Sequence, residues 1–395
     1  RDLVRSRGLG DVYKRQILLY MTKKILLVAT VQSHIAQFHR PLAEVLHAHG
    51  YEVHAAARNN LAEKNGLQLD FVDKVFDVRF SRSPKSKENM IAFNQLRGIV
   101  DSGNYEVVHC NTPMGGMIAR LATRAARKKG TKLFYTAHGF HFYDGAPKKN
   151  WMIFYPIEKF FSRMTDVLIT ITHEDYKVAS EAFHCQVSYM HGVGVSGERY
   201  KPVTIEEKLA LRGKMGYPRN AKILLCIGEL NDNKNQVMAI RMMHKVVAKY
   251  PEAILLLAGN GPKQKFLEQL IKQEGLERNV KMIGYVTNLQ DYQHIIDVQV
   301  SCSLREGLPL NIVESMLSGN PVVAGLNRGH RELIQDGING YIVEPNDYES
   351  MGTRVLNLLD NDDLRKQIVQ NAMIFAQDFT FTSVKKELEE IYFGK

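Results

Sequence analysis

The chain has few cysteines, a single tryptophan and no long hydrophobic run. Cys110, Cys185, Cys226 and Cys302 lie too far apart along the sequence to form a metal-binding motif, so we interpret them as reduced thiols of a cytoplasmic protein. No apolar stretch approaches the ~18 residues that are needed to cross a bilayer. These absences argue against a disulfide-stabilised secreted protein, a zinc module and an integral membrane protein.

The composition is otherwise that of a globular protein, with 45% hydrophobic and 24% charged residues. At roughly 150 residues per domain, the length predicts two or three domains. The net charge of +10 is uneven, because residues 1–20, 21–200 and 201–395 contribute +3, +7 and 0. A one-sided basic excess is typical of binding to nucleic acid, an anionic membrane surface or a phosphate-bearing substrate, although an ordinary solvated surface would explain it equally well.

The first twenty residues differ from the rest of the sequence. Residues 1–16 are basic and have no strand or helix periodicity, and the apolar run 17–20 is too short for the core of a signal peptide. Residues 11–16 look like a translated sequencing adapter. We therefore expect the natural chain to begin at Met21 and residues 1–20 to be a non-native extension.

From Met21 onward, short apolar runs alternate with amphipathic helical patterns, which predicts parallel sheets covered by helices on both faces. The strands are expected at 24–30, 51–56, 106–110, 131–137, 167–172, 222–227, 253–258, 280–283, 298–301, 321–324 and 340–343. A glycine-rich segment at 191–202 separates two series. The fold class is therefore α/β, with two doubly wound, Rossmann-like domains facing a cleft. The expected domains are 21–195 and 196–380, followed by a helix at 381–395 that could pack back on the N-terminal domain.

The segment 303–316 is the most informative part of the sequence. It follows a predicted strand and opens a helix, and Pro309 suits the first turn of that helix. The free N–H groups of such a turn bind anions such as phosphate. Glu306 precedes the helix and Glu314 lies within it, and carboxylates can accept hydrogen bonds from sugar hydroxyls. The alternative is that both are ordinary solvated charges.

Two further loops follow successive predicted strands. Lys234 lies in the loop that begins at Gly228, where it could neutralise a diphosphate. Gly259 and Gly261 follow the next strand and would permit a close approach of the backbone. A solvated lysine and a simple turn would explain each loop alone. Together, at neighbouring strand ends, the loops indicate a nucleotide-sugar site.

These motifs occur in the same order in the retaining glycosyltransferases of family 4, which use nucleotide sugars and have the two-domain GT-B fold. The sequence resembles this family from Met21 to about Phe393. The pair Glu306 and Glu314, separated by seven residues, matches the family signature. Residues 135–143 look like the bacterial branch that builds capsule and exopolysaccharide.

The resemblance implies a role for each matching residue. Glu314 would hold the ribose hydroxyls, Glu306 the hydroxyls of the donor sugar and Lys234 the diphosphate. His138 would face the reacting sugar and complete the catalytic set. The other donor-binding residues would be Gly228, Gly259, Gly261, Tyr285, Ser303, Gly307, Leu308 and Leu310. The residues expected near the acceptor are Ser33, His34 and His141.

The sequence departs from the family pattern at two places. Glu229 stands where the family usually has an arginine, and residues 31–35 replace the usual glycine-rich loop. Asp360-Asn361-Asp362 resembles the metal-binding Asp-x-Asp motif of the other glycosyltransferase fold, but it opens a predicted helix and is interpreted as a helix cap. No metal or cofactor is expected, and the nucleoside diphosphate sugar would be a co-substrate.

An aromatic and basic stretch at 148–163 allows two interpretations. It could rest on a membrane surface, which would suit an acceptor carried on a polyprenyl diphosphate. It could equally be a helix that packs its aromatic face into the core.

The function expected from the sequence is sugar transfer with retention of the anomeric configuration. The donor would be a UDP-linked hexose or N-acetylhexosamine, and the acceptor a glycan or polyprenyl-linked glycan in surface polysaccharide synthesis. The enzyme would be cytoplasmic, in peripheral contact with the inner face of the membrane, and would not bind nucleic acid. Two alternatives stay open: a nucleotide-sugar epimerase of the same fold, and a catalytically silent sugar-nucleotide-binding protein at the membrane surface.

Overall fold

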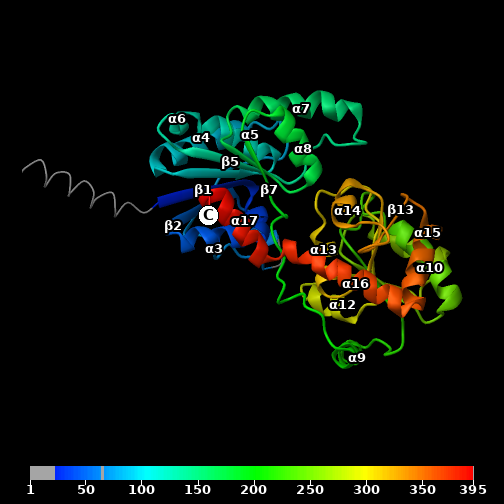
Figure 1. The fold of residues 1–395 in the computed structure, drawn as a ribbon. Coiled ribbons are helices and arrows are strands. Elements are labelled where there is room, and N and C mark those ends of the chain that lie inside the picture. The colour runs from blue at the N-terminus through cyan, green and yellow to red at the C-terminus, as the bar shows by residue number, and fades with distance from the viewer. Residues whose placement is uncertain (1–22, 64–65, 395) are drawn as a thin grey trace, which may run out of the picture. The chain divides into compact units, whose positions relative to one another are not determined.

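The computed structural model describes residues 23–63 and 66–394 and divides them into two α/β units (Figure 1). The first unit ends at Val193 and takes in the chain again from Lys385, and the second unit runs from Gly194 to Val384. The proposed extension at 1–20 lies outside the described residues. None of the helices described is long and apolar enough to cross a membrane.

The first unit contains a seven-stranded parallel sheet with the order β3-β2-β1-β4-β5-β6-β7. Its strands are β1 (Lys23–Val31), β2 (Tyr51–Arg58), β3 (Lys74–Asp77), β4 (Val107–Asn111), β5 (Lys132–Ala137), β6 (Val167–Thr170) and β7 (Gln186–Tyr189). The central strands are apolar runs because both faces of the sheet are covered. The edge strands β3 and β7 were not predicted, since they are short and only partly buried.

Helices cover the sheet of the first unit. They are α2 (Gln32–Phe38), α3 (Arg40–Ala48), α4 (Glu88–Gly103), α5 (Pro113–Ala122), α6 (Arg124–Arg127), α7 (Lys148–Ser162) and α8 (His173–Ala182), with a short 3₁₀ turn at Leu61–Glu63. The spacing of the apolar residues after β1 fits one helical pattern, but the structure divides the segment at His39. The apolar residues of that pattern are Ile35, Phe38, Leu42, Val45 and Leu46. Pro41 explains the break, because it lacks the N–H that a continuous helix would use.

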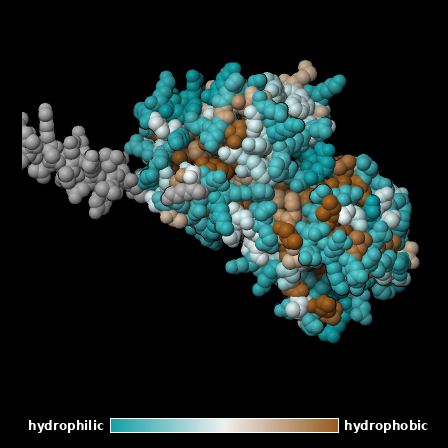
Figure 2. Space-filling view, viewed as in Figure 1, coloured by the Kyte–Doolittle hydropathy of each residue, from teal (hydrophilic) through white to brown (hydrophobic). Residues whose placement is uncertain are grey.

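Helix α7 is the aromatic and basic stretch for which two interpretations were open. Trp151, Phe154 and Tyr155 pack against the core of the first unit, so the aromatic face is directed inward. Met152 and Phe160 are 78% and 50% exposed. On the face drawn in Figure 2, the coloured hydrophobic residues form separate patches among hydrophilic ones rather than one continuous band.

The last helix, α17 (Phe381–Phe393), packs on the first unit through its final turns. The Tyr392 hydroxyl lies 2.5 Å from Nδ1 of His109. The ring of Phe393 stacks on His49 with 3.9 Å between ring centroids. These aromatic contacts explain why the chain returns to the first unit after completing the second.

The second unit contains a six-stranded parallel sheet with the order β10-β9-β8-β11-β12-β13. Its strands are β8 (Ile223–Ile227), β9 (Ile254–Ala258), β10 (Val280–Gly284), β11 (Val298–Ser301), β12 (Val322–Gly325) and β13 (Tyr341–Val343). Alternate residues of β8 enter opposite core clusters: Leu224 and Cys226 lie on one face and Ile223 and Leu225 on the other. The predicted doubly wound architecture is therefore confirmed, with a core on each side of the sheet.

The helices of the second unit follow the strands in the expected alternation. They are α9 (Ile205–Lys214), α10 (Gln236–Lys249), α11 (Gln264–Gln273), α12 (Leu289–Ile295), α13 (Leu310–Leu317), α14 (Arg328–Leu333), α15 (Tyr348–Asp360) and α16 (Asp362–Ala376), with a 3₁₀ turn at Gln377–Phe379. The Asn361 side chain accepts a hydrogen bond from the backbone N–H of Leu364 at 3.0 Å. The Asp-x-Asp-like motif therefore caps α16, as the sequence predicted.

Candidate active site

In the second unit, the predicted donor loops meet at the carboxyl ends of neighbouring strands. The N–H of Gly228, after β8, donates to the carbonyl of Ala258 at the end of β9. The N–H of Leu304, after β11, donates to the carbonyl of Asn233 at 2.7 Å. Because parallel strands end at one edge of the sheet, loops that are distant in sequence are joined there.

Lys234 and Glu306 form an ion pair within these loops. The ammonium Nζ of Lys234 lies 2.5 Å from Oε1 of Glu306, and the two side chains are 23% and 16% exposed. The Lys234 backbone N–H is also held by the side chain of Asn231. The structure therefore brings together the side chains predicted to hold the diphosphate and the donor sugar.

The glycines in this region are required by the packing of the loops. A Cβ on Gly228 would lie 2.8 Å from Cδ of Lys234, and one on Gly259 would lie 2.1 Å from the carbonyl oxygen of Gly228. A Cβ on Gly261 would lie 2.4 Å from the carbonyl oxygen of Leu230. The sequence suggested that these glycines allow close approach of the backbone, and the structure shows that the neighbouring loops themselves make that approach.

Glu314 lies on α13 and is half-buried. Burial raises the pKa of its carboxyl group to about 7, although the hydrogen bond with Tyr200 and the positive charge of Arg199 oppose the rise. The same burial, together with the charge of Glu314, raises the pKa of the Tyr200 phenol. Glu314 is therefore poised to change its protonation state near neutral pH.

The segment between Glu306 and Glu314 presents its backbone rather than its apolar side chains. Helix α13 begins at Leu310, and no side chain caps its N-terminus. The side chains of Leu308 and Leu310 pack against the core of the second unit. A donor phosphate at this point would therefore meet the main chain of these two leucines.

Ser303 and Gly307 contact a loop that the sequence reasoning missed. The carbonyl of Ser303 accepts a hydrogen bond from the Asn327 side chain at 2.7 Å. A Cβ on Gly329 would lie 2.6 Å from the carbonyl oxygen of Gly307. His330 lies in α14, which Asn327 caps, and burial lowers its pKa to about 4. Asn327 and Gly329 were the available signal, because they follow β12 at the next strand end of the same sheet.

Tyr285 and Glu229 are the two other side chains of interest near the strand ends of the second unit. Glu229 follows Gly228 in the loop after β8. Tyr285 follows β10 and is 58% exposed, so its ring is accessible. The Glu229 carboxylate accepts a hydrogen bond from the Asn231 side chain at 3.0 Å. This acidic side chain occupies the position where the family usually has an arginine.

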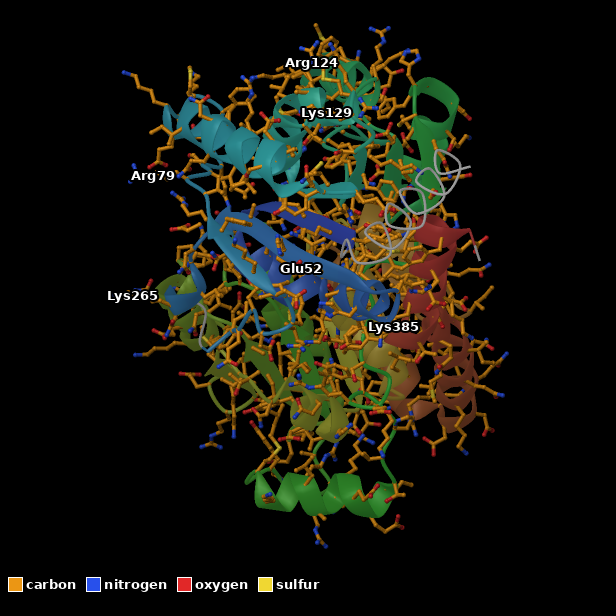
Figure 3. All side chains as sticks on the ribbon, turned by 90° about the vertical axis from the view of Figure 1, so that its left-hand side faces the viewer. Glu52, Arg79, Arg124, Lys129, Lys265 and Lys385 are labelled. Atoms are coloured by element: carbon orange, nitrogen blue, oxygen red, sulfur yellow. The ribbon has the colours of Figure 1, made fainter. Side chains whose placement is uncertain are left out.

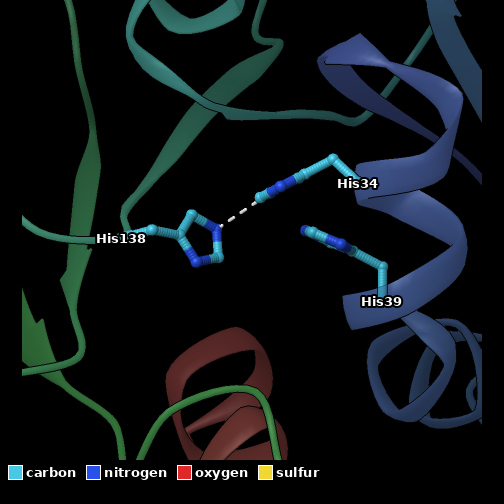
Figure 4. Close-up of side chains that lie close together, drawn as sticks. All are labelled: His34, His39 and His138. Atoms are coloured by element: carbon cyan, nitrogen blue, oxygen red, sulfur yellow. Dashed lines mark hydrogen bonds between the residues drawn. The ribbon is translucent and has the colours of Figure 1, made fainter. Parts of the chain in front are cut away.

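In the first unit, His138 follows β5 and meets histidines from the region of α2 and α3 (Figure 4). Its Nε2 lies 3.2 Å from Nε2 of His34 and 3.2 Å from Oδ1 of Asn111. Burial lowers the pKa of His138 to about 3, and the nearby His39 contributes to the shift. At neutral pH, His138 is therefore an uncharged hydrogen-bonding group.

The other residues predicted near the acceptor have separate surroundings. Ser33 is buried, and its hydroxyl accepts a hydrogen bond from the Asn60 side chain at 2.9 Å. The His141 ring stacks on Phe154, with 4.6 Å between ring centroids. Of the three predicted acceptor residues, His34 is the one that the structure places against His138.

A cavity of about 450 Å³ lies at the other end of the first sheet, where Lys24, Glu106 and Thr131 line the amino ends of its strands. Lys129 also lines it, and Figure 3 shows Lys129 and Arg124 on the same outer region of this unit. Ligands of doubly wound sheets bind at the carboxyl ends of strands, so we do not assign this cavity to the active site.

Comparisons with known proteins identify the family. Residues 207–374 match the sequence model for glycosyl transferases group 1, and residues 24–172 match the one described as glycosyl transferase 4-like. EpsD of Bacillus subtilis strain 168, a protein named as a glycosyltransferase, is 38% identical over 374 residues, which cover 94% of this chain and 97% of EpsD.

More distant relatives extend the comparison. An Escherichia coli enzyme named UDP-Gal:alpha-D-GlcNAc-diphosphoundecaprenol alpha-1,3-galactosyltransferase is 22% identical over 77% of this chain and 80% of its own length. The crystal structure of Anabaena Alr3699/HepE in complex with UDP has a TM-score of 0.74 at 20% identity and covers 94% of this chain and all of that one. The chain therefore belongs to the group 1, family 4 type of glycosyltransferases with the GT-B fold, and it is an enzyme of this class.

Proposed function

We propose that this glycosyltransferase moves a sugar from a UDP-linked donor to a glycan or polyprenyl-linked acceptor during surface polysaccharide synthesis, with retention of the anomeric configuration. The name of the Escherichia coli relative, with its UDP-galactose donor and lipid diphosphate acceptor, supports the proposed substrate classes. The UDP complex of the HepE structure also supports a uridine nucleotide. We also propose that the transferred sugar is a hexose or an N-acetylhexosamine.

The ion pair between Lys234 and Glu306 carries this proposal. Both charges lie in loops at the carboxyl ends of β8 and β11, where a doubly wound sheet binds its ligand. An incoming diphosphate would take over the ammonium of Lys234. The Glu306 carboxylate would then accept hydrogen bonds from the donor sugar, while Glu314 accepts them from the ribose.

Retention of configuration is proposed to proceed by front-face departure of the diphosphate. A double displacement needs a carboxylate nucleophile on the opposite face of the sugar. In the described part of the chain, the His138 side chain forms hydrogen bonds with His34 and Asn111. Neither of these partners is a carboxylate. The leaving phosphate would instead accept the proton of the acceptor hydroxyl, and the charge of Lys234 would stabilise it.

The direct test is a transfer assay with a panel of UDP-sugars and polyprenyl diphosphate-linked acceptors. We expect one donor to be consumed only in the presence of an acceptor, and nuclear magnetic resonance to show an unchanged anomeric configuration in the product. Inversion would contradict the proposed mechanism. Conversion of the donor without an acceptor would instead identify an epimerase, and binding without turnover a silent binding protein.

Contact with the inner face of the cytoplasmic membrane is part of the same proposal. The outward side of α7 carries Met152 and Phe160, and Lys149 nearby is also exposed. Met152→Glu should reduce flotation of the protein with anionic vesicles. Met90→Glu is the matched control, because Met90 on α4 is 71% exposed. Equal flotation of both variants and the unmodified chain would contradict this contact.

A further inference from the structure

Three histidines of the first unit lie around one point (Figure 4). His34 belongs to α2, His39 separates α2 from α3, and His138 follows β5. One possible ligand atom from each histidine lies within 4.8 Å of the ligand atoms of the other two. The break at His39 matters here, because it places a second imidazole from the same segment beside His138.

The spacing of two of these imidazoles is close to that of a metal centre, and the third lies within 4.8 Å. Tetrahedral zinc with Zn–N bonds of about 2.0–2.1 Å holds two of its nitrogen ligands roughly 3.3–3.4 Å apart. Nε2 of His34 and Nε2 of His138 are 3.2 Å apart. In the ion-free chain these two nitrogens share a hydrogen bond, so an ion would replace the shared hydrogen at a similar spacing, and rotation of the His39 ring would bring in the third nitrogen.

His39 supplies an independent observation. Its side chain is only 4% exposed, and Nδ1 has no hydrogen-bond partner among the described residues. Figure 4 shows the His39 ring directed toward the space between His34 and His138. A buried imidazole nitrogen without a partner is unfavourable, and a turn of the His39 ring that brought Nδ1 to an ion would satisfy it.

We propose that His34, His39 and His138 form a binding site for one zinc-type divalent transition-metal ion. Three imidazoles favour zinc and related ions over magnesium or calcium, which prefer oxygen ligands. Three protein ligands also leave a fourth coordination position for water or another small ligand.

The protonation state of the site suits a metal. Burial lowers the pKa of His39 to about 4 and that of His138 to about 3. Burial, followed by the charges of His138 and His39, also lowers the pKa of His34 well below its ordinary value. The imidazoles are therefore uncharged at neutral pH, which is the form that binds metals.

Metal binding at this site would affect sugar transfer, and this consequence rests on the proposed function. His138 is the residue that we expect to contact the donor sugar, so an ion held by it would occupy the group that the sugar needs. Zinc should therefore inhibit sugar transfer.

Metal binding is tested first, independently of activity. Metal-free full-length chain is titrated with Co²⁺ alone, and the visible absorption of the ion reports its coordination. We expect one ion per chain with a tetrahedral spectrum, displaced by Zn²⁺. His34→Gln and His39→Gln should each weaken binding at least about tenfold.

His109→Asn is the matched control. His109 is buried, and its ring centroid lies 6.1 Å from that of His39. Its two nitrogens already contact Thr136 and Tyr392. This variant should keep the metal. If His39→Gln fails to fold, as judged by its melting curve, the half-buried His34 provides the same readout. Absence of stoichiometric binding, or equal binding by His34→Gln and the unmodified chain, would overturn the site.

Inhibition is tested second, with His39→Gln, which removes a ligand that we do not place in the catalytic machinery. Zinc equimolar with the chain should inhibit the unmodified enzyme and spare this variant. Binding without inhibition would overturn the inhibitory role and leave the metal site standing. If the metal-free enzyme transferred no sugar, that result would contradict the proposed function but not the metal site. The cobalt titration measures metal binding and does not depend on turnover.

Discussion

Lys234 and Glu306 form a direct ion pair with 2.5 Å between Nζ and Oε1, although they are 72 positions apart in the sequence. The pair joins the loop after β8 to the loop after β11, and both side chains are largely shielded from solvent. If a diphosphate binds Lys234 as proposed, the ammonium would exchange its carboxylate partner for the phosphate. The pair would then link donor binding to the release of Glu306.

Replacing either member of this pair should impair sugar transfer. Lys234→Met removes the cation proposed to stabilise the leaving diphosphate, and we expect turnover to fall at least about tenfold. Glu306→Gln should lower turnover to a similar extent while retaining the fold, because an amide can still accept a hydrogen bond from Lys234. Steady-state kinetics with a fixed acceptor would measure both effects.

Lys263→Met is the control for this pair. Lys263 forms an ion pair with Asp232 at 2.8 Å, but Asp232 is 86% exposed and the pair should contribute little. Turnover by Lys263→Met should equal that of the unmodified enzyme. A similar loss in Lys263→Met and Lys234→Met would show that general surface charge, and not the proposed site, controls the rate.

Gly259 in a donor loop and Gly275, which follows α11, should differ in their tolerance of alanine. Gly259→Ala places a Cβ 2.1 Å from the Gly228 carbonyl oxygen at a φ of +136°, so both a clash and strained backbone are expected. Gly275 has a φ of +66° and open space around it. Gly275→Ala should therefore cost only about 1–2 kcal/mol of unfolding free energy. Denaturant melts should rank Gly259→Ala as clearly the less stable variant, and equal midpoints would contradict the packing described.

Glu314 predicts a pH dependence of nucleotide binding. Its pKa of about 7 means that the carboxyl group becomes protonated as the pH falls through neutrality. The ionised form is the better acceptor for ribose hydroxyls, so UDP affinity should fall below pH 7, by up to about tenfold per pH unit. Titration calorimetry between pH 6 and pH 8 measures this effect. The same titration of the Glu314→Gln variant measures the part of the pH dependence that comes from ionisation of the nucleotide itself.

Tyr200→Phe sharpens this prediction. The Tyr200 hydrogen bond lowers the pKa of Glu314, so its removal should raise that pKa further. The loss of UDP affinity should then begin at a higher pH than in the unmodified enzyme. A shift to lower pH would contradict the assigned role of Tyr200.

Glu229→Arg should strengthen donor binding. The substitution restores the cation that the family usually has at this position, and the native side chain is exposed, so steric cost is small. We expect the donor KM to fall by about two- to fivefold, the range of an exposed ion pair. Glu229→Gln separates the loss of the acidic charge from the gain of a cation. An unchanged KM in both variants would place this side chain away from the diphosphate.

The buried histidines predict that acid destabilises the first unit. In the unfolded chain an imidazole takes up a proton below about pH 6.5, whereas His39 in the folded chain does so only near pH 4. The unfolded state binds more protons between these values, so the unfolding free energy is highest above pH 6.5 and falls as the pH decreases toward 4. Thermal melts should show a shallower pH dependence for His39→Gln than for the unmodified chain, and equal slopes would contradict this account.

The alternation of strands and helices was predictable from the sequence, because it depends on local periodicity. β8 and β9 are short apolar runs that are each followed by a glycine, and their bounds agree closely with the prediction. The edge strands β3 and β7 were missed, since half-exposed strands of four residues lack a clear pattern. The helix break at His39 was missed because the apolar spacing continues across Pro41.

The candidate site likewise combines features that the sequence predicts with features that only the structure shows. By itself, the sequence determined which segments follow strand ends and so named Glu306, Glu314 and Lys234 through short local motifs, and its resemblance to the family added His138. Only the tertiary structure decided that Lys234 contacts Glu306, that Tyr200 reaches Glu314, and that the His138 imidazole meets His34 and His39. Hydrophobic periodicity records which face of an element is buried, whereas contacts between distant residues depend on the order in which strands join a sheet.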